Sequence, residues 1–327
     1  MIRYGVIGTN FITDWFIEAG KTMKDFQLAA VYSRTDERAQ AFAEKHGARH
    51  TFTSIEEMAT SSLIDAVYIA SPTSFHAEQA KLCMNHGKHV LCEKPLASHD
   101  REVEGLIQTA SKNGVILMEA VKNTALPNFH SLKEAIHRIS PIRRMVTSYC
   151  QYSSRYDAFK QGTVLNAFNP DFSNGALMDI GLYCVYPIVD LFGKPDDIKA
   201  SGVRLSSGVD GEGTLLLIYP DMEAVAMYSK ITNSQLPSEI QGEKGTIRID
   251  HIQKLQDIQI HYTDGRVEDV TKPQTNLAMS YEIKTFHQKI NRQPSSINSL
   301  ETTLYTAQVM TEARDQLDVV FPADKTR

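Results

Sequence analysis

The sequence predicts a doubly wound parallel α/β sheet, followed by a C-terminal α+β domain with a large, mainly antiparallel sheet. Up to about residue 120, short apolar segments rich in Val, Ile and Ala alternate with helical patterns. Strands that are apolar on both faces indicate a parallel sheet covered by helices on both sides. Further along, strand patterns follow one another across short turns, which is typical of hairpins. We therefore expect domains at residues 1–121 and 122–327, with the C-terminal helices able to pack back on the first domain.

The first domain is built from alternating strands and helices. The expected strands are 2–7, 27–32, 65–71, 88–92 and 115–120. The expected helices are 10–23, 35–47, 74–87 and 98–114. Three of these helical segments end in His-Gly or Asn-Gly, which is a common way for a helix to end.

The second domain begins with a helix and continues mainly as strands. The chain leads through 119–136 into a helix, then into a strand at 142–154 and a helix at 174–193. Pro187 removes the N–H that would bond the Tyr183 carbonyl, which predicts a bend just past that tyrosine. The remaining expected elements are strands at 198–207, 213–219, 224–231, 246–250 and 258–270 and helices near 277–291 and 299–317.

Composition restricts the class of partner. The net charge of −5 and the pI of about 6.1 argue against a nucleic-acid surface or an anionic membrane as the main partner. No signal peptide is expected, and no apolar run approaches the roughly 18 residues that a membrane span needs. The cysteines are far apart, so we expect free thiols in a reducing cytoplasm. They are Cys83, Cys92, Cys150 and Cys184.

The first strand-to-helix turn approximates the dinucleotide fingerprint G-x-G-x-x-G/A of Rossmann folds. Gly8 holds the first position, Asn10 the second and Thr13 the third. Asn tolerates a positive φ, so the tight turn is expected to survive at Asn10. Backbone N–H groups at the helix start could then bind a pyrophosphate, although such turns also occur without one. The candidate cofactor residues here are Gly8, Thr9, Asn10, Phe11 and Ile12.

The second strand ends without the acidic residue that an NAD-specific site normally has. Ser33 and Arg34 stand there, and Arg38 follows one helical turn later. A hydroxyl and a guanidinium suit a 2′-phosphate, which favours NADP over NAD. The alternative is that both arginines are simply solvated.

Two more strand ends carry polar residues at the same edge of the sheet. One gives the segment "SPTSFH" and the other gives "EKP", Glu93 to Pro95. His76 either contacts the cofactor or packs in the fold. No metal site is expected, because His86 and His89 lack carboxylate or cysteine neighbours at ligand spacing. The further candidates for cofactor binding are Ser71, Pro72, Thr73, His76, Glu93 and Lys94.

These motifs, together with "GALMDIGLY" at 175–183, resemble the Gfo/Idh/MocA family over nearly the whole chain. The resemblance implies that Lys94 lies beside the nicotinamide and that Glu93 orients Lys94 or contacts the cofactor. It further implies that Tyr183 is the general acid/base and that Asp179 positions the substrate or the tyrosine. Members similar to dihydrodiol dehydrogenase have a tyrosine at this position, so the chain resembles these members most. Asp179 and Tyr183 are four residues apart, so both lie on one helix face.

The sequence departs from many family members at Lys122 and Asn123, where those members have an aromatic residue and an arginine. The loop at 156–175 offers polar groups that either contact sugar hydroxyls or are ordinary loop residues. These are Arg155, just before the loop, and Tyr156, Lys160 and Asn166 within it.

The predicted function is an NADP- or NAD-dependent oxidoreductase that interconverts a secondary alcohol and a carbonyl on a sugar, polyol or cyclic diol. The alternative is a non-catalytic cofactor-binding sensor of the same fold. An intact set of Lys94, Asp179 and Tyr183 favours the enzyme, because a sensor needs no proton relay. The resemblance also implies a homodimer or larger homo-oligomer that forms through the C-terminal sheet, and the cysteines predict a cytoplasmic location.

Overall fold

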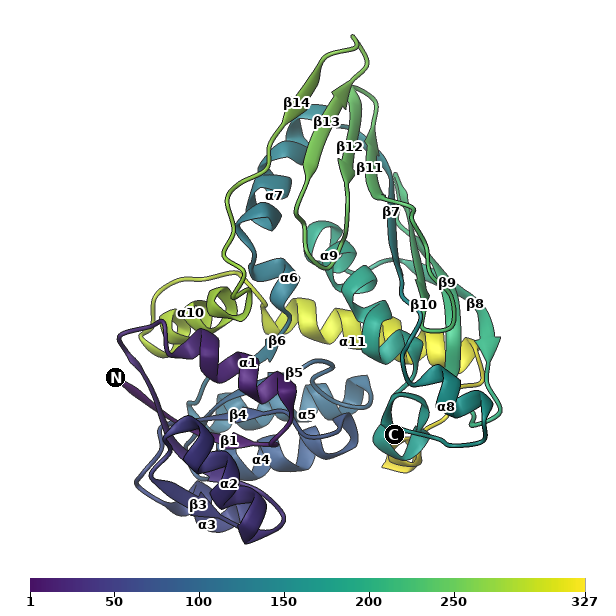
Figure 1. Cartoon of the computed structure of the whole chain (residues 1–327). Helices are drawn as coiled ribbons and strands as arrows, with labels where there is room; N and C mark the ends of the chain where they lie inside the picture. The colour runs from purple at the N-terminus through teal and green to yellow at the C-terminus, as the bar shows by residue number, and fades with distance from the viewer. Residues whose placement is uncertain (327) are drawn as a thin grey trace. The chain divides into compact units, whose positions relative to one another are not determined.

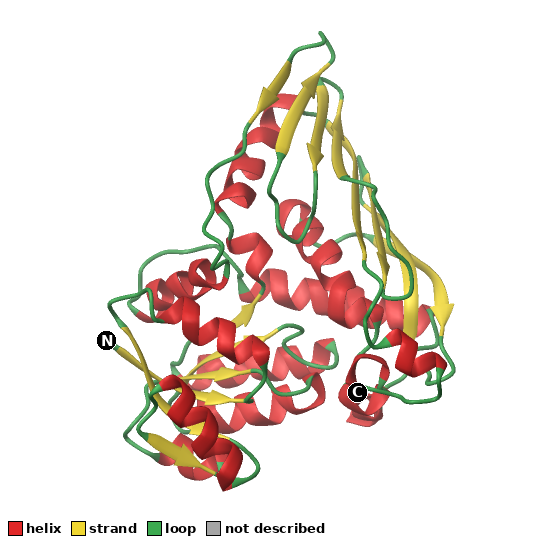
Figure 2. Cartoon of the chain, in the orientation of Figure 1, coloured by secondary structure: helices red, strands yellow, loops and turns green. Residues whose placement is uncertain are grey.

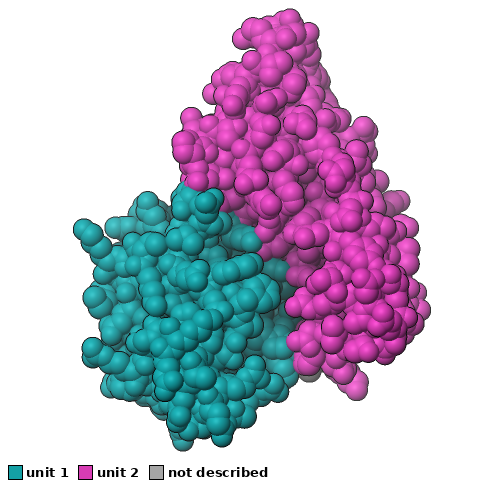
Figure 3. All heavy atoms as spheres, viewed as in Figure 1, with its two compact units in different colours: residues 1–122, 275–300 teal, residues 123–274, 301–327 magenta. Residues whose placement is uncertain are grey.

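The structure, a computed structural model, describes residues 1–326 and divides into two compact units. Unit 1 comprises Met1–Lys122 and Thr275–Leu300. Unit 2 comprises Asn123–Gln274 and the chain from Glu301 onward. Figure 3 colours the two units separately.

Unit 1 contains a parallel six-stranded sheet in the order β3-β2-β1-β4-β5-β6, which confirms the doubly wound prediction. The strand order reverses between β1 and β4, and ligands of such sheets bind at the carboxyl ends of the strands beside this point. The three-residue strand β3 was not predicted, since it is too short to give a pattern. The strands are β1 (Ile2–Ile7), β2 (Phe26–Tyr32), β3 (His50–Phe52), β4 (Ala66–Ile69), β5 (His89–Glu93) and β6 (Leu117–Ala120).

Helices cover both faces of this sheet (Figures 1 and 2). Helices α1, α2 and α10 share one apolar core with side chains of one sheet face, including Tyr4 and Tyr68. Helix α10 comes from the late segment of the chain, and its Phe286 is fully buried beside Tyr4. The helices of unit 1 are α1 (Phe11–Gly20), α2 (Asp36–His46), α3 (Ile55–Thr60), α4 (His76–Asn85), α5 (Asp100–Asn113) and α10 (Met279–Ile290).

A buried hydrogen-bond chain also fastens α10 to the sheet. His287 lies with Nε2 2.9 Å from the Tyr4 hydroxyl and Nδ1 2.9 Å from Asp25 Oδ2. A segment far away in the sequence therefore completes the core of unit 1.

Unit 2 contains an eight-stranded sheet in the order β14-β13-β12-β11-β7-β10-β9-β8. Strands β7 and β10 pair in parallel and the other neighbours pair antiparallel, which confirms the mainly antiparallel prediction. Strand β11, which pairs with the central β7, was not predicted. The strands are β7 (Ile142–Cys150), β8 (Asp197–Arg204), β9 (Asp210–Ile218), β10 (Glu223–Ser229), β11 (Ser238–Gly242), β12 (Gly245–Ile249), β13 (Ile258–Tyr262) and β14 (Val267–Asp269).

The helices of unit 2 include a π-helical turn, Leu177–Gly181, directly before α9 (Leu182–Phe192). The helical stretch Pro170–Phe192 is long and apolar enough to cross a membrane, but a single helix of this kind is weak evidence of a membrane span. Moreover, 72% of its most apolar window is buried inside the protein, as in the core helix of a soluble protein. The other helices are α6 (Lys122–Ala125), at the start of the unit, α7 (Pro127–Ile139), α8 (Tyr156–Lys160) and α11 (Leu300–Gln316).

We predict that Phe286→Ala destabilises the protein by about 3–5 kcal/mol, because it leaves a cavity in the core shared by α1, α10 and the sheet. Urea unfolding followed by circular dichroism measures the change. Lys284→Ala, on the exposed side of the same helix, should change the free energy of unfolding by less than about 0.5 kcal/mol. Equal effects of the two substitutions would contradict a core role for α10.

Candidate active site

The turn between β1 and α1 requires glycine at its first position. Gly8 has a φ of +109°, and a Cβ there would lie 2.7 Å from the Ala70 carbonyl oxygen. The backbone of this turn therefore runs closely against the end of β4, the neighbouring strand. Such a turn leaves room for a ligand to approach the backbone at the start of α1.

Asn10 does not take the positive φ expected of it. Its φ is −107°, and its side-chain oxygen caps α1 by accepting from the N–H groups of Ile12 and Thr13. Its amide group donates to the Ala70 carbonyl over 2.9 Å. Gly8 already supplies the reversal of the chain, so Asn10 is free to join the helix start to the end of β4.

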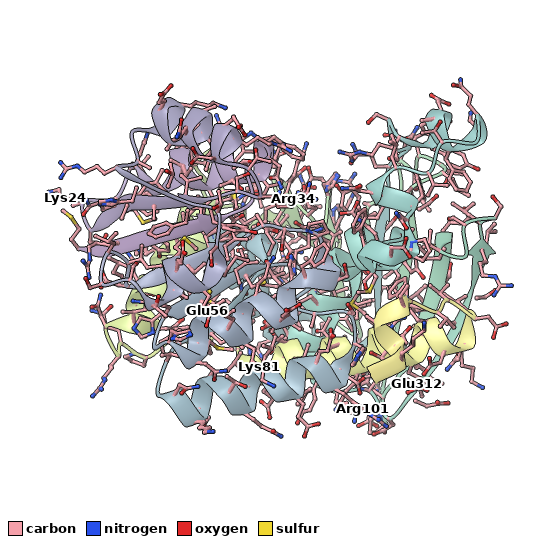
Figure 4. All side chains as sticks on the ribbon, turned by 90° about the horizontal axis from the view of Figure 1, so that it is seen from below. Lys24, Arg34, Glu56, Lys81, Arg101 and Glu312 are labelled. Atoms are coloured by element: carbon pink, nitrogen blue, oxygen red, sulfur yellow. The ribbon has the colours of Figure 1, made fainter. Side chains whose placement is uncertain are left out.

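The other predicted residues of this turn and of the β2 end lie at the same sheet edge. Thr9 and Ile12 are partly buried, and Phe11 is 51% exposed with its ring edge-on to Trp15. Ser33 is buried, and its N–H donates to the Phe52 carbonyl. Arg34, labelled in Figure 4, and Arg38 are both exposed. The two guanidinium groups are thus accessible beside the end of β2.

His76 joins the loops that follow β4 and β5. It is buried, with Nδ1 2.8 Å from the Pro95 carbonyl oxygen and Nε2 2.8 Å from the Ser71 carbonyl oxygen. Burial lowers the pKa of His76, although its two carbonyl neighbours oppose that shift. Both ring nitrogens therefore face backbone carbonyl oxygens, and the neutral ring donates a hydrogen bond to one of them at a time. These surroundings favour the packing interpretation of this histidine over a cofactor contact.

The rest of the "SPTSFH" segment is held by short-range contacts. The Ser71 hydroxyl donates to Gln79 Oε1 over 2.7 Å. Pro72 is partly buried and precedes a 3-10 turn, Thr73–Phe75, in which Thr73 is buried. These residues follow β4 and so lie at the edge of the sheet that carries the Gly8 turn.

Glu93 is bound on both carboxylate oxygens. Oε1 accepts from the Tyr68 hydroxyl over 2.6 Å, and Oε2 accepts from the Lys94 backbone N–H over 3.3 Å. Burial raises the pKa of Glu93, while Tyr68 and the charges of Lys94 and Lys122 lower it. Glu93 thus fixes the backbone at Lys94, which is partly buried at the end of β5.

Two buried carboxyl groups behind this strand end were missed in the sequence. Glu119, on β6, accepts from the Leu96 N–H over 2.9 Å and so fixes the loop after Pro95. Glu282, on α10, is 1% exposed, and burial followed by the charge of Glu93 raises its pKa well above the usual range. An acidic residue in a helix normally indicates a solvated face, so the sequence pattern gave no signal for Glu282.

In unit 2, Asp179 lies within the π-helical turn and Tyr183 follows in the first turn of α9. The Asp179 side chain is 35% exposed and forms an ion pair with Lys230 at 2.6 Å. Tyr183 is 7% exposed and packs edge-on against Tyr149, with ring centroids 6.0 Å apart. Burial and the nearby Asp179 charge raise the pKa of Tyr149 to about 12.

Asn123 compensates for the proline in α9. Pro187 offers no N–H to the Tyr183 carbonyl, and the Asn123 amide donates to that carbonyl over 3.3 Å. The same amide donates to the Ile252 carbonyl over 3.2 Å. Asn123, which departs from the family pattern, therefore has a structural role, because it binds the backbone of the candidate residue Tyr183.

Asp210, also missed in the sequence, caps the helix that carries Asp179. Its Oδ2 accepts from the Leu177 N–H over 2.6 Å, and a Cβ at Gly175 would overlap its other oxygen. Burial raises the pKa of Asp210 to about 6, although the hydrogen bonds to this helix start and the charge of Lys230 oppose the shift. Gly175, which has no side chain, thus leaves room for the buried carboxyl group of Asp210.

The segment around α8 forms an aromatic cluster. Tyr156 lies against Tyr152, Phe159 and Phe168. Lys160 forms an ion pair with Asp157 at 2.8 Å and lies over the rings of Tyr152 and Tyr156. Arg155 and Asn166 are exposed, so they remain candidates for contact with a hydroxylated ligand.

The structure thus gathers the predicted cofactor residues at the carboxyl edge of the sheet in unit 1, together with Lys94. Asp179 and Tyr183 lie together at the start of one helix in unit 2. The cysteines are free thiols, and within residues 1–326 no group of three or more potential ligands could hold a metal ion.

We predict that wild-type stability falls relative to the Asp210→Asn variant as pH rises from about 4 to 7. The folded-state pKa of about 6 lies above the reference value of 3.8, so the folded state retains a proton that the unfolded state has already lost. This stabilisation is complete below the unfolded pKa and disappears as pH rises through the folded one.

Urea unfolding of both proteins across this range measures the effect. The wild-type free energy of unfolding should decline relative to the variant by on the order of 2–3 kcal/mol. A difference that stays constant, or that grows in favour of the wild type with pH, would contradict the raised pKa.

Family models match both parts of the chain. One described as "Oxidoreductase family, NAD-binding Rossmann fold" matches residues 2–121, and a GFO/IDH/MocA C-terminal domain matches residues 132–248. The scyllo-inositol 2-dehydrogenase (NADP(+)) of Bacillus subtilis is 57% identical over 99% of this chain and 100% of its own length. A trans-1,2-dihydrobenzene-1,2-diol dehydrogenase of Xenopus tropicalis is 29% identical over 98% of this chain and 99% of its own.

Solved structures share the fold. KijD10, a 3-ketoreductase from Actinomadura kijaniata in complex with NADP and TDP-benzene, has a TM-score of 0.82 and 24% identity, covering 96% of this chain and 97% of its own. An aldose-aldose oxidoreductase from Caulobacter crescentus has a TM-score of 0.85 and 19% identity, covering 100% of this chain and 98% of its own.

The resemblance inferred from the motifs and the prediction of an oxidoreductase are confirmed by the family models and the 57% identical relative. The chain belongs to the Gfo/Idh/MocA family of oxidoreductases, whose N-terminal domain is an NAD-binding Rossmann fold.

Proposed function

We propose that this protein interconverts a secondary alcohol and a carbonyl on a cyclic polyol, with NADP as the preferred cofactor. The observation that carries the proposal is the 57% identity, along the whole chain, with an NADP-dependent scyllo-inositol 2-dehydrogenase. The proposed reacting groups, Lys94, Asp179 and Tyr183, support it, because they are the residue types that proton transfer at a secondary alcohol requires.

The residues of unit 1 suit a dinucleotide. Gly8, with a φ of +109°, lets the turn pack against the Ala70 carbonyl, and the start of α1 that follows offers backbone N–H groups of the kind that bind a phosphate. Asn10 already occupies the N–H groups of Ile12 and Thr13, so a pyrophosphate would bind N–H groups that precede them. Arg34 and Arg38 are exposed beside the end of β2, where a 2′-phosphate needs cations and an NAD-specific site has a carboxylate.

In oxidation, the alcohol carbon loses a hydride and the alcohol oxygen loses a proton. A nicotinamide dinucleotide held at the carboxyl edge of the unit 1 sheet would supply the hydride acceptor. Tyr183 reacts as the phenolate and takes the proton on its oxygen, and the positive charge of Lys94 stabilises that phenolate before the transfer. Asp179 accepts a hydrogen bond from a substrate hydroxyl and so fixes the orientation of the ring. In reduction the same groups act in the opposite order.

The physiological setting belongs to the same proposal. The acidic net charge favours a soluble protein whose main partner is a small molecule rather than nucleic acid or a membrane. Cysteines without disulfides suit a reducing cytoplasm. We expect a homodimer or larger homo-oligomer that forms through the eight-stranded sheet, and light scattering of the purified protein measures its mass.

We predict that Tyr183→Phe and Lys94→Ala each lower kcat by about 10²–10⁴-fold in the NADP-dependent oxidation of scyllo-inositol, because each removes a part of the proton relay. Initial rates of NADPH formation measure this, with an aldose and trans-1,2-dihydrobenzene-1,2-diol tested as alternative substrates. Tyr262→Phe, which removes a hydroxyl bound to Glu268 on the sheet, should keep the wild-type kcat. Near-wild-type kcat in both relay variants would overturn the assignment.

We also predict that Arg34→Asp raises the Kd of NADPH at least about tenfold and changes the Kd of NADH much less, because a carboxylate repels the 2′-phosphate. Fluorescence titration with each nucleotide measures both constants. Arg143→Ala, on β7 of unit 2, serves as a control for loss of an exposed arginine. Equal losses for the two nucleotides would show that Arg34 does not read the 2′-phosphate.

A further inference from the structure

Lys230 is a buried cation that the proposed reaction does not use. It is 3% exposed, and its ammonium group lies 2.6 Å from Asp179 Oδ2 and 3.3 Å from the Ala167 carbonyl oxygen. The ammonium also lies 5.2 Å from the centre of the Phe168 ring. Burying the charge of a lysine costs folding free energy unless the charge is paired. A buried lysine beside a candidate reacting residue therefore suggests a role in the site.

The backbone of Lys230 is held on both sides. Lys230 directly follows β10, its N–H donates to the Gly211 carbonyl over 2.9 Å, and its carbonyl accepts from the Ser153 N–H over 2.8 Å. The lysine therefore extends from a fixed point of the sheet. Burial of its side chain restricts the positions that its ammonium group can take. The ammonium group can in turn restrict the position of the carboxylate that it binds.

A second ion pair in unit 2 shows what is unusual about this one. Lys133 pairs with Asp190, on the same helix as Tyr183, and its ammonium lies 5.3 Å from the Phe129 ring. There the carboxylate is buried at 4% exposure and the lysine is 35% exposed. In the Lys230–Asp179 pair the lysine is 4% exposed and the carboxylate 35% exposed. The cation is thus inside the protein and the acid is presented outward.

An outward-facing carboxylate with a fixed, buried counter-charge suits the binding of a neutral hydroxyl group. The ammonium stabilises the ionised carboxylate, which then accepts a hydrogen bond from an alcohol. The same ammonium connects Asp179 to the Asn166–Phe168 turn at the end of the aromatic segment. The pair also changes the pKa of two neighbouring groups. The charge of Asp179 raises the pKa of Tyr149 on β7, and the charge of Lys230 lowers that of Asp210 on β9.

We propose that Lys230 is a positioning residue for the reaction: it fixes the Asp179 carboxylate and the Asn166–Phe168 turn in the arrangement that orients the hydroxylated substrate. Because Asp179 binds substrate only if the proposed function holds, this role of Lys230 rests on that function. Lys230 itself transfers no proton.

The test compares Lys230→Met, Lys230→Arg and the matched control Lys133→Met. For each we would measure the Kd of NADPH, the kcat and KM for the polyol against pH, and the urea midpoint. Lys230→Met should lower kcat/KM by about 10–100-fold, mainly through KM, with an unchanged NADPH Kd. The acid limb of its kcat/KM profile should move to higher pH, because Asp179 loses its counter-charge.

The control separates positioning from stability. Lys133→Met removes a lysine that also pairs with an aspartate of unit 2 and lies beside a phenylalanine ring. It should lower the urea midpoint while keeping the wild-type kcat/KM and pH profile. Lys230→Arg retains the charge and should recover part of the lost kcat/KM. If Lys230→Met lowers only the urea midpoint and keeps the wild-type KM and acid limb, Lys230 is merely structural and the inference is wrong.

A double-mutant cycle with Asp179→Asn distinguishes the two levels of the proposal. Lys230→Met should add less than about threefold loss in the Asp179→Asn background, since both substitutions remove one arrangement. Multiplicative losses would overturn the inference, because Lys230 would then act independently of Asp179. If Asp179→Asn and Tyr183→Phe themselves keep the wild-type kcat/KM, the proposed function fails as well; if they lose it while Lys230→Met does not, only this inference fails.

Discussion

The cofactor edge of unit 1 depends on the imidazole of His76. Its ring lies between the carbonyl of Ser71 and the carbonyl of Pro95, so one buried side chain holds the loops after β4 and β5 at a fixed spacing. Strand ends leave backbone carbonyls without partners, and burying them unpaired is costly. Lys94 directly precedes Pro95, so this contact also restrains the backbone at Lys94.

Other polar side chains also bind backbone groups or side chains near the candidate site residues. Asn10 joins the start of α1 to the end of β4, and Asn123 binds the carbonyl that Pro187 leaves unpaired. Asp210 caps the helix start before Asp179, and Lys230 holds Asp179 itself. The backbone beside the proposed reacting groups thus has hydrogen-bond partners, and such preorganisation would orient a substrate if the proposed function holds.

Much of this architecture could be predicted from the sequence, because it follows from local patterns. Apolar strands with helical segments between them indicate a parallel sheet, and the carboxyl ends of such strands share one edge. The sequence pattern therefore predicts that Gly8, Ser33, Ser71 and Lys94 lie at one edge of the sheet. Strands β3 and β11 were not predicted, because β3 has only three residues and β11 has Ile240 as its one large apolar side chain.

The supporting residues could not be predicted, because their roles depend on contacts between distant parts of the chain. Lys230 is 51 residues from Asp179 in the sequence, and Asp210 is 33 residues from Leu177. Each looks like an ordinary polar residue at a strand end. Asn10 was misjudged for a related reason, since its φ is set by the hydrogen bond to Ala70 and not by its intrinsic tolerance of positive φ.

Helix α10 has a consequence for how the protein is made. Residues 1–122 contain every strand of the dinucleotide-binding sheet, yet the core on one face also needs Met279, Ile283 and Phe286 of α10. A ribosome must synthesise the whole of residues 123–274 before those side chains emerge. During that interval the nascent sheet has an apolar face without its final cover, which is the kind of surface that chaperones bind. The cofactor domain is therefore first to begin folding and among the last parts of the chain to finish.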